Sequence, residues 1–183
     1  METAWYFRLF FVYLGWFVIS GILRGLIKPK RMGWGRQQSK PWTIAFTVSL
    51  LAPLALTWFI TYSMNVVFWI GLVIIIFGEV VFALGFIAMR EQPEKKQALV
   101  DWGIYKVSRH SHVLAGNICT LGVVITGWNP DSIVYVGLWI YFVLLLIFLH
   151  FGVLDEERLN IEKLGQEYID YMKRVPRYIF GKI

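Results

Sequence analysis

Side chains that could do chemistry gather in two short segments of this chain, each at the end of a long apolar stretch. The first runs from Gly103 to Gly116 and holds most of the hydrogen-bonding groups, and the second is Asp155-Glu156-Glu157. The residues between them, 117–154, are long enough for a helical hairpin through a bilayer, since a crossing can be as short as about 17 residues. Such a hairpin returns both segments to one membrane face, where they can form one site. This arrangement predicts a membrane-embedded enzyme.

The residue types in these segments suit a charged, water-soluble ligand. Arg109 and His110 are hydrogen-bond donors, Tyr105 adds an aromatic face, and Glu156 with Glu157 forms a negative pole. Adjacent residues of a helix point about 100° apart, so the two carboxylates cannot both face one atom. One carboxylate can therefore bind an ammonium or a ribose, while the other braces Arg109 or the backbone. An interfacial network of salt bridges is the alternative, and the residue types alone leave both interpretations open.

Composition places the chain among polytopic membrane proteins. Of its 183 residues, 57% are hydrophobic and 17% are aromatic, and the mean hydropathy is +0.58. Five segments are predicted to cross a membrane core of about 30 Å; the fourth is short and partly polar, and the first lacks the features of a cleaved signal peptide. They are Ala4–Ile27, Pro41–Met64, Val66–Met89, Val113–Trp128 and Ser132–Leu154. The predicted fold class is an all-α integral membrane protein with five transmembrane helices.

The positions of the basic residues set the expected orientation. Of 18 Lys and Arg residues, all except Arg8 fall within residues 24–40, 90–109 and 158–182. With five spans these three zones share one face, which the positive-inside rule assigns to the cytosol. We therefore expect the N-terminus outside, the C-terminus and active site in the cytosol, and attraction of the net charge of +6 to anionic lipids. Nothing in the sequence predicts nucleic-acid binding or an obligate protein partner.

The third predicted span carries two features of a membrane helix bundle. Gly71, Gly78 and Gly85 recur every seven residues, and such a stripe of small residues lets a second helix approach closely. Glu79 lies near the middle of the same span, where an ionisable side chain is costly and marks a functional candidate. A hydrogen-bonded Glu79 inside the bundle is the alternative.

The remaining features limit the chemistry. Cys119 is the only cysteine, so the chain has no internal disulfide and no cysteine-rich metal site. His110 and His112 are two residues apart and diverge by about 200° on a helix, and no metal site is predicted. Beyond the last span, residues 155–171 have a helical spacing of apolar side chains, and we expect them to lie along the membrane face as a helix or helix pair.

Four motifs, taken in order, resemble the isoprenylcysteine carboxyl methyltransferase family. They are Gly103-x-Tyr105-x-x-x-Arg109-His110, Glu156-Glu157, Gly165-Gln-Glu-Tyr168-x-x-Tyr171 and Val175-Pro-Arg-Tyr178. The resemblance covers residues 97–178, and the size and five-span layout look like the minimal prokaryotic, particularly archaeal, members. Together with the predicted spans it implies one domain over residues 1–183, in which 1–89 form a three-helix scaffold and 90–183 the cofactor-binding and catalytic half.

By this resemblance the chain is expected to be an S-adenosylmethionine-dependent methyltransferase, with S-adenosylhomocysteine as product. The acceptor implied is lipophilic, namely the carboxylate of an isoprenylcysteine-like molecule. The cofactor pocket implied is cytosolic and is formed by the loop before the fourth helix and by the C-terminal tail. The cofactor-binding residues implied are Gln97, Ala98, Leu99, Val100, Tyr105, His110, Ser111, His112, Val113 and Glu156.

The predicted catalytic residues are Arg109 and Glu157. The family's Arg-His-Pro-x-Tyr reads Arg109-His110-Ser111-His112-Val113 here, and the position of a substrate-facing arginine of eukaryotic members is Gly152. Arg109 is then the remaining cationic group that could orient a carboxylate acceptor with two hydrogen bonds. If the acceptor were an amine, Glu157 or His112 would be the candidate base.

A lipophilic acceptor is expected to reach the site sideways from the bilayer, because each buried CH₂ holds it there by about 0.8 kcal/mol. Gly152 and the small pair Ala115-Gly116 are expected to leave a gap for it between helices. Three alternatives to this function remain: a phospholipid N-methyltransferase, an NADPH-dependent sterol-reductase-like enzyme, and a non-enzymatic membrane scaffold or transporter. Glu79 in mid-membrane is the best support for the last of these.

Overall fold

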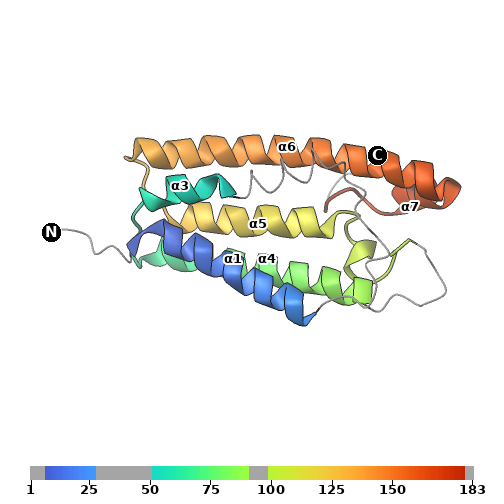
Figure 1. Ribbon diagram of the computed structural model, residues 1–183, viewed down its shortest axis with the longest axis horizontal. Coiled ribbons are helices and arrows are strands. Elements are labelled where there is room, and N and C mark those ends of the chain that lie inside the picture. Colours follow the sequence, from blue (N-terminus) through green and yellow to red (C-terminus); the bar gives the residue numbers. More distant parts are fainter. Residues whose placement is uncertain (1–6, 28–50, 91–98, 180–183) are drawn as a thin grey trace.

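The computed structural model describes residues 7–27, 51–90 and 99–179, and its regular structure there is helical apart from an isolated bridge between Arg8 and Thr61. The helices are α1 (Leu9–Leu26), α3 (Pro53–Trp58), α4 (Val66–Arg90), the 3₁₀ helix η2 (Gly103–Lys106), α5 (Ser111–Thr126), α6 (Ile133–Leu164) and α7 (Gln166–Arg174). The long helices lie side by side along one axis, with α5 between α4 and α6 and with α7 at one end (Figure 1). The predicted all-helical class is confirmed for these residues.

The stripe of small residues on α4 is the face on which α5 packs, as the sequence predicted. A Cβ atom added to Gly78 would lie 3.0 Å from the backbone nitrogen of Cys119 and would overlap its sulfur. One added to Gly71 would lie 2.6 Å from the backbone nitrogen of Thr126, and one added to Gly85 would meet the first turn of α5. The absence of side chains along this stripe therefore sets the position of α5, and with it that of the first polar segment.

We expect Gly78→Ala to lower the free energy of unfolding by about 1–3 kcal/mol, the usual cost of overpacking a close contact. The new methyl group would push Cys119, and therefore α5, away from α4. Gly137 on α6 provides the matched control, because a Cβ atom added there has no atom within 4 Å. Gly137→Ala should be neutral or slightly stabilising, since alanine favours a helix over glycine. Thermal unfolding in detergent compares the two variants, and equal melting temperatures would contradict the close packing.

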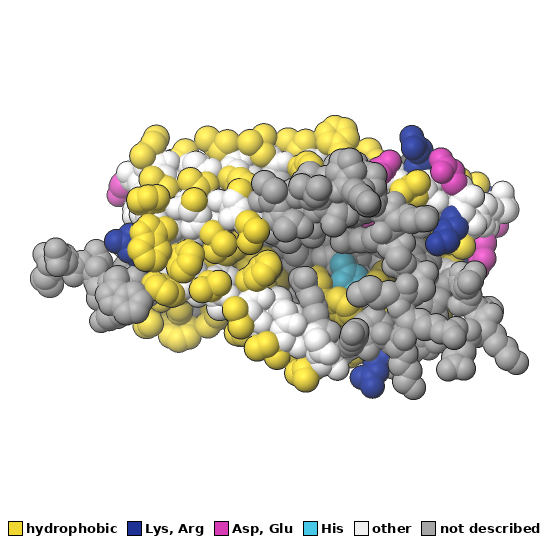
Figure 2. Space-filling view, in the orientation of Figure 1, with side chains coloured by type: hydrophobic (Ala, Val, Ile, Leu, Met, Phe, Trp, Pro, Cys, Tyr) yellow, Lys and Arg dark blue, Asp and Glu magenta, His cyan; other side chains and the backbone are white. Residues whose placement is uncertain are grey.

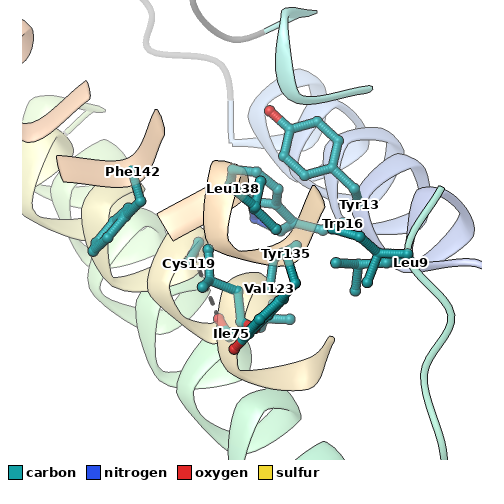
Figure 3. Close-up of a cluster of buried hydrophobic side chains, with 11 residues drawn as sticks. Leu9, Tyr13, Trp16, Ile75, Cys119, Val123, Tyr135, Leu138 and Phe142 are labelled. Atoms are coloured by element: carbon teal, nitrogen blue, oxygen red, sulfur yellow. Dashed lines mark hydrogen bonds between the residues drawn. The ribbon is translucent and has the colours of Figure 1, made fainter. Parts of the chain in front are cut away.

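The hairpin predicted between the two polar segments is formed by α5 and α6. Ser132 begins α6 by accepting a hydrogen bond from the backbone N–H of Tyr135 at 3.4 Å. The hydroxyl group of Tyr135 donates to the carbonyl oxygen of Val124 at 3.1 Å and ties α6 back to α5. The buried cluster beside this contact joins the hairpin to α1 and α4 (Figure 3). Its labelled side chains are Leu9, Tyr13 and Trp16 of α1, Ile75 of α4, Cys119 and Val123 of α5, and Tyr135, Leu138 and Phe142 of α6.

α6 is longer than the predicted span Ser132–Leu154 and continues without a break to Leu164. The added part is rich in Glu, Leu, Arg and Lys, which are good helix formers. The helix ends at Gly165, whose φ of +58° is a conformation that favours glycine. The expectation for residues 155–171 is corrected in part, because those up to Leu164 extend α6 and only α7 is a separate helix. Glu156 and Glu157 therefore stand on the polar end of α6, beyond its apolar stretch.

The first two predicted spans are shorter than expected at the ends that the structure describes. α1 begins at Leu9 rather than Ala4, and α3 ends at Trp58 rather than Met64. The reason is backbone pairing between the segments that precede α1 and follow α3, in which the N–H of Leu9 donates to the carbonyl oxygen of Ile60 at 2.8 Å. The remainder of the second prediction falls largely outside the described residues.

Two of the described helices, α4 and α6, are long and apolar enough to cross a membrane, and α1 and α5 are shorter apolar helices. Outward apolar side chains of the two long helices are exposed, with Val73 at 63% and Ile140 at 58%. Hydrophobic side chains cover the flank of the bundle in Figure 2, whereas charged side chains gather at the end that carries α7. This distribution is compatible with a membrane protein, since large exposed apolar surfaces mark contact with lipid or with another protein.

Glu79 is hydrogen-bonded inside the bundle, as the alternative interpretation held. Nε1 of Trp16 donates to its Oε1 atom at 2.6 Å, and the hydroxyl group of Ser20 donates to the same oxygen. The sulfur of Cys119 lies 3.8 Å from that oxygen and 3.5 Å from the carbonyl oxygen of Ile75, so its single S–H group is shared between the two acceptors. A charged or polar group within apolar surroundings needs such partners. These contacts tie α1 and α5 to the middle of α4.

Candidate functional site

The structure brings the two polar segments together at one end of the bundle, which confirms the arrangement expected from the hairpin. Nη2 of Arg109 donates to Oε1 of Glu157 at 2.8 Å. Nε2 of His110 lies 3.2 Å from the same oxygen. The side chains of Arg109 and Glu157 are 2% and 5% exposed, so their ion pair is buried. The contact joins the start of α5 to the polar end of α6.

Arg109 also holds the C-terminal tail. Its Nη1 atom donates to the carbonyl oxygens of Met172 at 2.7 Å and Val175 at 2.8 Å. Its backbone N–H donates to the carbonyl oxygen of Pro176 at 3.1 Å. The guanidinium group therefore links three parts of the chain that are distant in sequence: the loop before α5, the end of α6 and the segment after α7. These contacts give Arg109 a positioning role, and the catalytic role predicted for it stays a prediction.

Arg177 is the residue of this cluster that the sequence reasoning did not assign to the site. Its Nε and Nη2 atoms donate to both carboxylate oxygens of Glu157 at 2.7–3.1 Å, a bidentate pair. The side chain of Arg177 remains 18% exposed, unlike that of Arg109. Its backbone carbonyl oxygen accepts a hydrogen bond from Ser108 at 3.1 Å, which holds the tail against the loop before α5. The available signal was the motif Val175-Pro-Arg-Tyr178, which served only for the family resemblance.

The electrostatics of Glu157 follow from these contacts. Burial alone would raise the pKa of Glu157, but hydrogen bonds from His110, Arg177 and Arg109 outweigh burial and hold the pKa well below its usual range. The same interaction raises the pKa of Arg177. Glu157 is therefore a carboxylate at neutral pH and a weak base. Its predicted role as a base for an amine acceptor stays a prediction, and the low pKa disfavours it.

Glu156 differs from its neighbour in its surroundings. Its side chain is 21% exposed, and its Oε2 atom lies 3.8 Å from Nδ1 of His110. Because adjacent residues of a helix point about 100° apart, Glu156 lies at the edge of the cluster while Glu157 lies at its centre. The division of the two carboxylates into one that braces and one that faces outward was predicted, and the structure assigns the bracing role to Glu157.

Tyr105 and His112 form a second group, on the α4 side of α5. The hydroxyl group of Tyr105 and Nδ1 of His112 are hydrogen-bonded at 2.9 Å. The ring of His112 packs between those of Phe82 and Phe86, with centroids 4.9 Å and 4.8 Å away. His110 instead faces α6, so the two histidines diverge as predicted. Tyr171 of α7 donates to the carbonyl oxygen of Tyr105 at 2.7 Å and connects this group to the tail.

The other predicted cofactor-binding residues are buried around these two groups. Leu99 packs with Tyr168, Tyr171 and Val175, and Val100 packs with Ala88 and Tyr105. Ser111 and Val113 are buried in the first turn of α5. Because the side chains of these residues are buried, a ligand would contact their backbone N–H and carbonyl groups. Gln97 and Ala98 lie outside the described residues.

The predicted access residues lie on different faces. Gly116 borders open space, since a Cβ atom added to it has no atom within 4 Å. Ala115 is fully buried, and its carbonyl oxygen lies against Gly78 of α4, so it faces away from any gap beside α6. Gly152 is partly buried on α6. His150 lies two residues before Gly152 on α6. Its Nδ1 atom is hydrogen-bonded to the hydroxyl group of Tyr178 in the C-terminal tail at 3.1 Å.

A family model described as a protein of unknown function, DUF1295, matches residues 32–175 of the 183. The chain belongs to the DUF1295 family. The matched range contains Arg109, Glu156 and Glu157 but ends just before Arg177. No curated protein and no solved structure matches the chain.

The site of this DUF1295 protein offers hydrogen-bonding and charged groups for an organic ligand. Among the described residues, no group of three His, Cys, Asp or Glu side chains is placed to hold a metal ion. The partly exposed acidic side chain is Glu156, and the partly exposed basic side chain is Arg177. An acidic and a basic group in one cluster can hold a ligand that carries both an ammonium and a carboxylate, or two ligands of opposite charge.

Proposed function

We propose that this protein is an integral membrane, S-adenosylmethionine-dependent methyltransferase that methylates the carboxylate of a lipophilic, isoprenylcysteine-like acceptor. The observation that carries the proposal is that the two adjacent carboxylates have different surroundings. Glu157 is occupied by two guanidinium groups, and Glu156 stands at the partly exposed edge of the cluster. The motifs that resemble the isoprenylcysteine carboxyl methyltransferases meet at this place in the fold.

The membrane arrangement that we propose has five transmembrane helices, with the N-terminus outside and the C-terminus in the cytosol. The end of α4, the start of α5 and the end of α6 lie at the same end of the bundle (Figure 1). Charged side chains gather at this end (Figure 2), and the positive-inside rule assigns it to the cytosol. The cofactor pocket would then open to the cytosol between the loop before α5 and the C-terminal tail.

Residues of both groups described above are of the kinds that can bind S-adenosylmethionine. Glu156 would hold the ammonium or a ribose hydroxyl group, Tyr105 would border the ligand, and backbone groups of residues 110–113 would complete the site. When bound, the cofactor supplies an electrophilic methyl group on a sulfonium, and its transfer to a carboxylate oxygen breaks the C–S bond and leaves a neutral thioether. The chain itself contributes position and exclusion of water.

A carboxylate acceptor agrees with the low basicity of the cluster. Such an acceptor has a pKa of about 3–4 and is already ionised at neutral pH, so its methylation releases no proton and needs no base. Arg177 is better placed than Arg109 to orient it, because Arg177 is partly exposed, whereas Arg109 is buried and both of its terminal nitrogens bond Glu157 or the tail. An amine acceptor would require a base, and hydrogen bonds from two arginines make Glu157 a poor one.

Binding of two cofactors to the purified protein tests the proposal. We expect S-adenosylhomocysteine to bind and NADPH not to bind, as measured by isothermal titration calorimetry in detergent. Labelled methyl transfer to a prenylated cysteine derivative and to a phospholipid amine, run in parallel, separates carboxylate from amine chemistry. Binding of NADPH alone would establish the reductase alternative, and binding of neither ligand would favour a non-enzymatic scaffold or transporter.

A further inference from the structure

Arg8 stands apart from the other basic residues of the chain. All other Lys and Arg residues fall within residues 24–40, 90–109 and 158–182, and charged side chains gather at the end of the bundle that carries α7 (Figure 2). Arg8 immediately precedes α1, and the start of α1 lies at the opposite end, beside α3 (Figure 1). In the proposed membrane arrangement this end faces outward, where basic residues are disfavoured. Membrane orientation therefore does not explain a basic residue at this position.

The side chain of Arg8 is held in place by Trp58, the last residue of α3. Nη1 of Arg8 donates to the carbonyl oxygen of Trp58 at 2.6 Å, and the guanidinium carbon lies 4.9 Å from the centre of the Trp58 ring. The backbone beside both residues is joined by the bridge between Arg8 and Thr61. These contacts fix the guanidinium group before a ligand arrives, which lowers the entropy cost of binding.

The edge of the guanidinium group formed by Nε and Nη2 makes no hydrogen bond to any described residue. Nε of Arg8 is buried without a partner, and Nη1 makes the hydrogen bond to Trp58. Arg177 uses the same two atoms, Nε and Nη2, to hold both carboxylate oxygens of Glu157 at 2.7–3.1 Å. Such an edge matches a carboxylate or a phosphate with two parallel hydrogen bonds. Because a buried donor without a partner is unfavourable, an anion at this edge of Arg8 would be stabilising.

The charges around Arg8 also favour an anion. Arg8 is the N-cap residue of α1, whose first turn has no acidic residue and no side-chain cap. The N-terminus of a helix carries a partial positive charge, so the guanidinium group adds like charge to it. Among the residues that the structure describes, Arg8 forms no ion pair, and the exposed Asp131 before α6 is not its partner. An anion from outside the chain would neutralise both positive charges.

The side chains around Arg8 are those of a membrane surface. Trp58 is 40% exposed and Phe59 is 67% exposed, and Phe10 packs edge-on against Trp58 with ring centroids 5.3 Å apart. Aromatic side chains of this kind are enriched at the level of the lipid headgroups. A phospholipid offers both a phosphate group for Arg8 and hydrocarbon chains for the exposed rings, whereas a soluble phosphate offers only the first.

We infer that Arg8 binds the phosphate group of a phospholipid in the outer leaflet through its Nε–Nη2 edge, with the lipid chains against Trp58 and Phe59. The site is independent of the proposed methyltransferase activity, and it uses the proposed orientation only to assign the leaflet. The bound lipid would anchor the start of α1 and the end of α3 at the membrane surface.

Quenching of tryptophan fluorescence by brominated lipids tests the inference in detergent. Trp58 is partly exposed beside the site, so a lipid brominated on its acyl chains should quench it when bound there. Two lipids with the same brominated chains are compared: phosphatidylglycerol, which carries a phosphate, and diacylglycerol, which lacks it. We expect the wild-type protein to reach half-maximal quenching at an about tenfold lower mole fraction of phosphatidylglycerol, the ratio that one charge-assisted hydrogen bond provides.

Two variants and a soluble competitor make the result specific. Arg8→Gln removes the charge and the Nε–Nη2 edge, and should bring the two lipids to equal values. Lys173→Gln is the matched control, because it removes one positive charge from α7 at the opposite end of the bundle, where the side chain is 65% exposed. This control should keep the tenfold ratio. Inorganic phosphate, added to the wild-type protein, should leave the ratio unchanged.

Equal values for the two lipids in the wild-type protein overturn the inference, and this result needs no variant to fold. A tenfold ratio that survives in Arg8→Gln also overturns it. An equal loss in Arg8→Gln and Lys173→Gln would assign the preference to overall charge and would likewise overturn a site at Arg8. If inorganic phosphate abolishes the ratio, the edge binds soluble phosphate and the lipid is not its occupant.

Discussion

Replacing Glu157 with alanine is expected to lower the free energy of unfolding by about 3–5 kcal/mol, the usual cost of removing one partner from a buried ion pair. The carboxylate is the common partner of Arg109, Arg177 and His110. The guanidinium group of Arg109, which is 2% exposed in the intact protein, would lose its counter-charge. The variant should also loosen the tail, because Glu157 orients Arg109 and Arg177, and both arginines contribute to holding residues 172–177. Chemical unfolding in detergent, followed by tryptophan fluorescence, measures the change.

Glu162→Ala is the matched control on the same helix. Glu162 pairs with Arg158 at 3.6 Å, and both side chains are mostly exposed. An exposed pair of this kind contributes at most about 0.5 kcal/mol. A loss of similar size in the two variants would mean that the ion pairs around Glu157 are no stronger than a surface pair, and would contradict the positioning role given to this carboxylate.

The pH dependence of stability separates the charge of Glu157 from its packing. Its pKa is held below the usual range in the folded protein, so the folded state binds a proton less readily than the unfolded chain, in which a glutamate has a pKa of about 4.3. The stabilisation is therefore complete above about pH 5.5 and is lost as the pH falls through and below 4.3. The difference in unfolding free energy between wild type and Glu157→Ala should shrink over that range. A difference that is constant from pH 7 to pH 3 would assign the effect to packing alone.

Those parts of the fold that depend on local spacing could be predicted from the sequence. Gly71, Gly78 and Gly85 recur at a spacing that puts them on one helix face, and their lack of side chains is itself the reason that α5 approaches there. The α5–α6 hairpin followed from apolar length and from the polar segments at its two ends. The polarity of the sequence changes at Asp155 and predicts the end of the span there, but helix propensity continues to Gly165, a recognisable stop signal at which α6 ends.

The site could be predicted only to the level of its segments. The 100° between Glu156 and Glu157 indicates that one of them faces inward, but which one depends on the rotation of α6 against Arg109, and that rotation is set by packing along the whole helix. Arg177 reaches Glu157 only because Gly165 and α7 reverse the chain. No local sequence pattern predicts that the chain reverses and brings Arg177 back to Glu157. The contact between Tyr105 and His112 is likewise a product of how η2 sits on α4.

The second large effect concerns the cofactor. We expect Glu156→Gln to weaken the binding of S-adenosylhomocysteine by about ten- to a hundredfold, since a hydrogen bond to a charged group is worth about 1.5–3 kcal/mol. Glu156 has the exposure that a ligand contact requires, whereas Glu157 is enclosed by its partners. Stability should change less than in Glu157→Ala, because the Glu156 side chain is 21% exposed and that of Glu157 is 5% exposed.

Asp155→Asn is the control that makes the result specific to Glu156. It removes the same charge one residue earlier, where the side chain points about 100° away, so long-range electrostatic effects on the ligand are nearly matched. We expect less than about a threefold change in affinity for this variant, which corresponds to under 0.7 kcal/mol. If both variants weaken binding equally, the acidic end of α6 acts only through its overall charge. If neither does, Glu156 belongs with Glu157 to the network that holds the tail, and the cofactor pocket proposed at this edge is wrong.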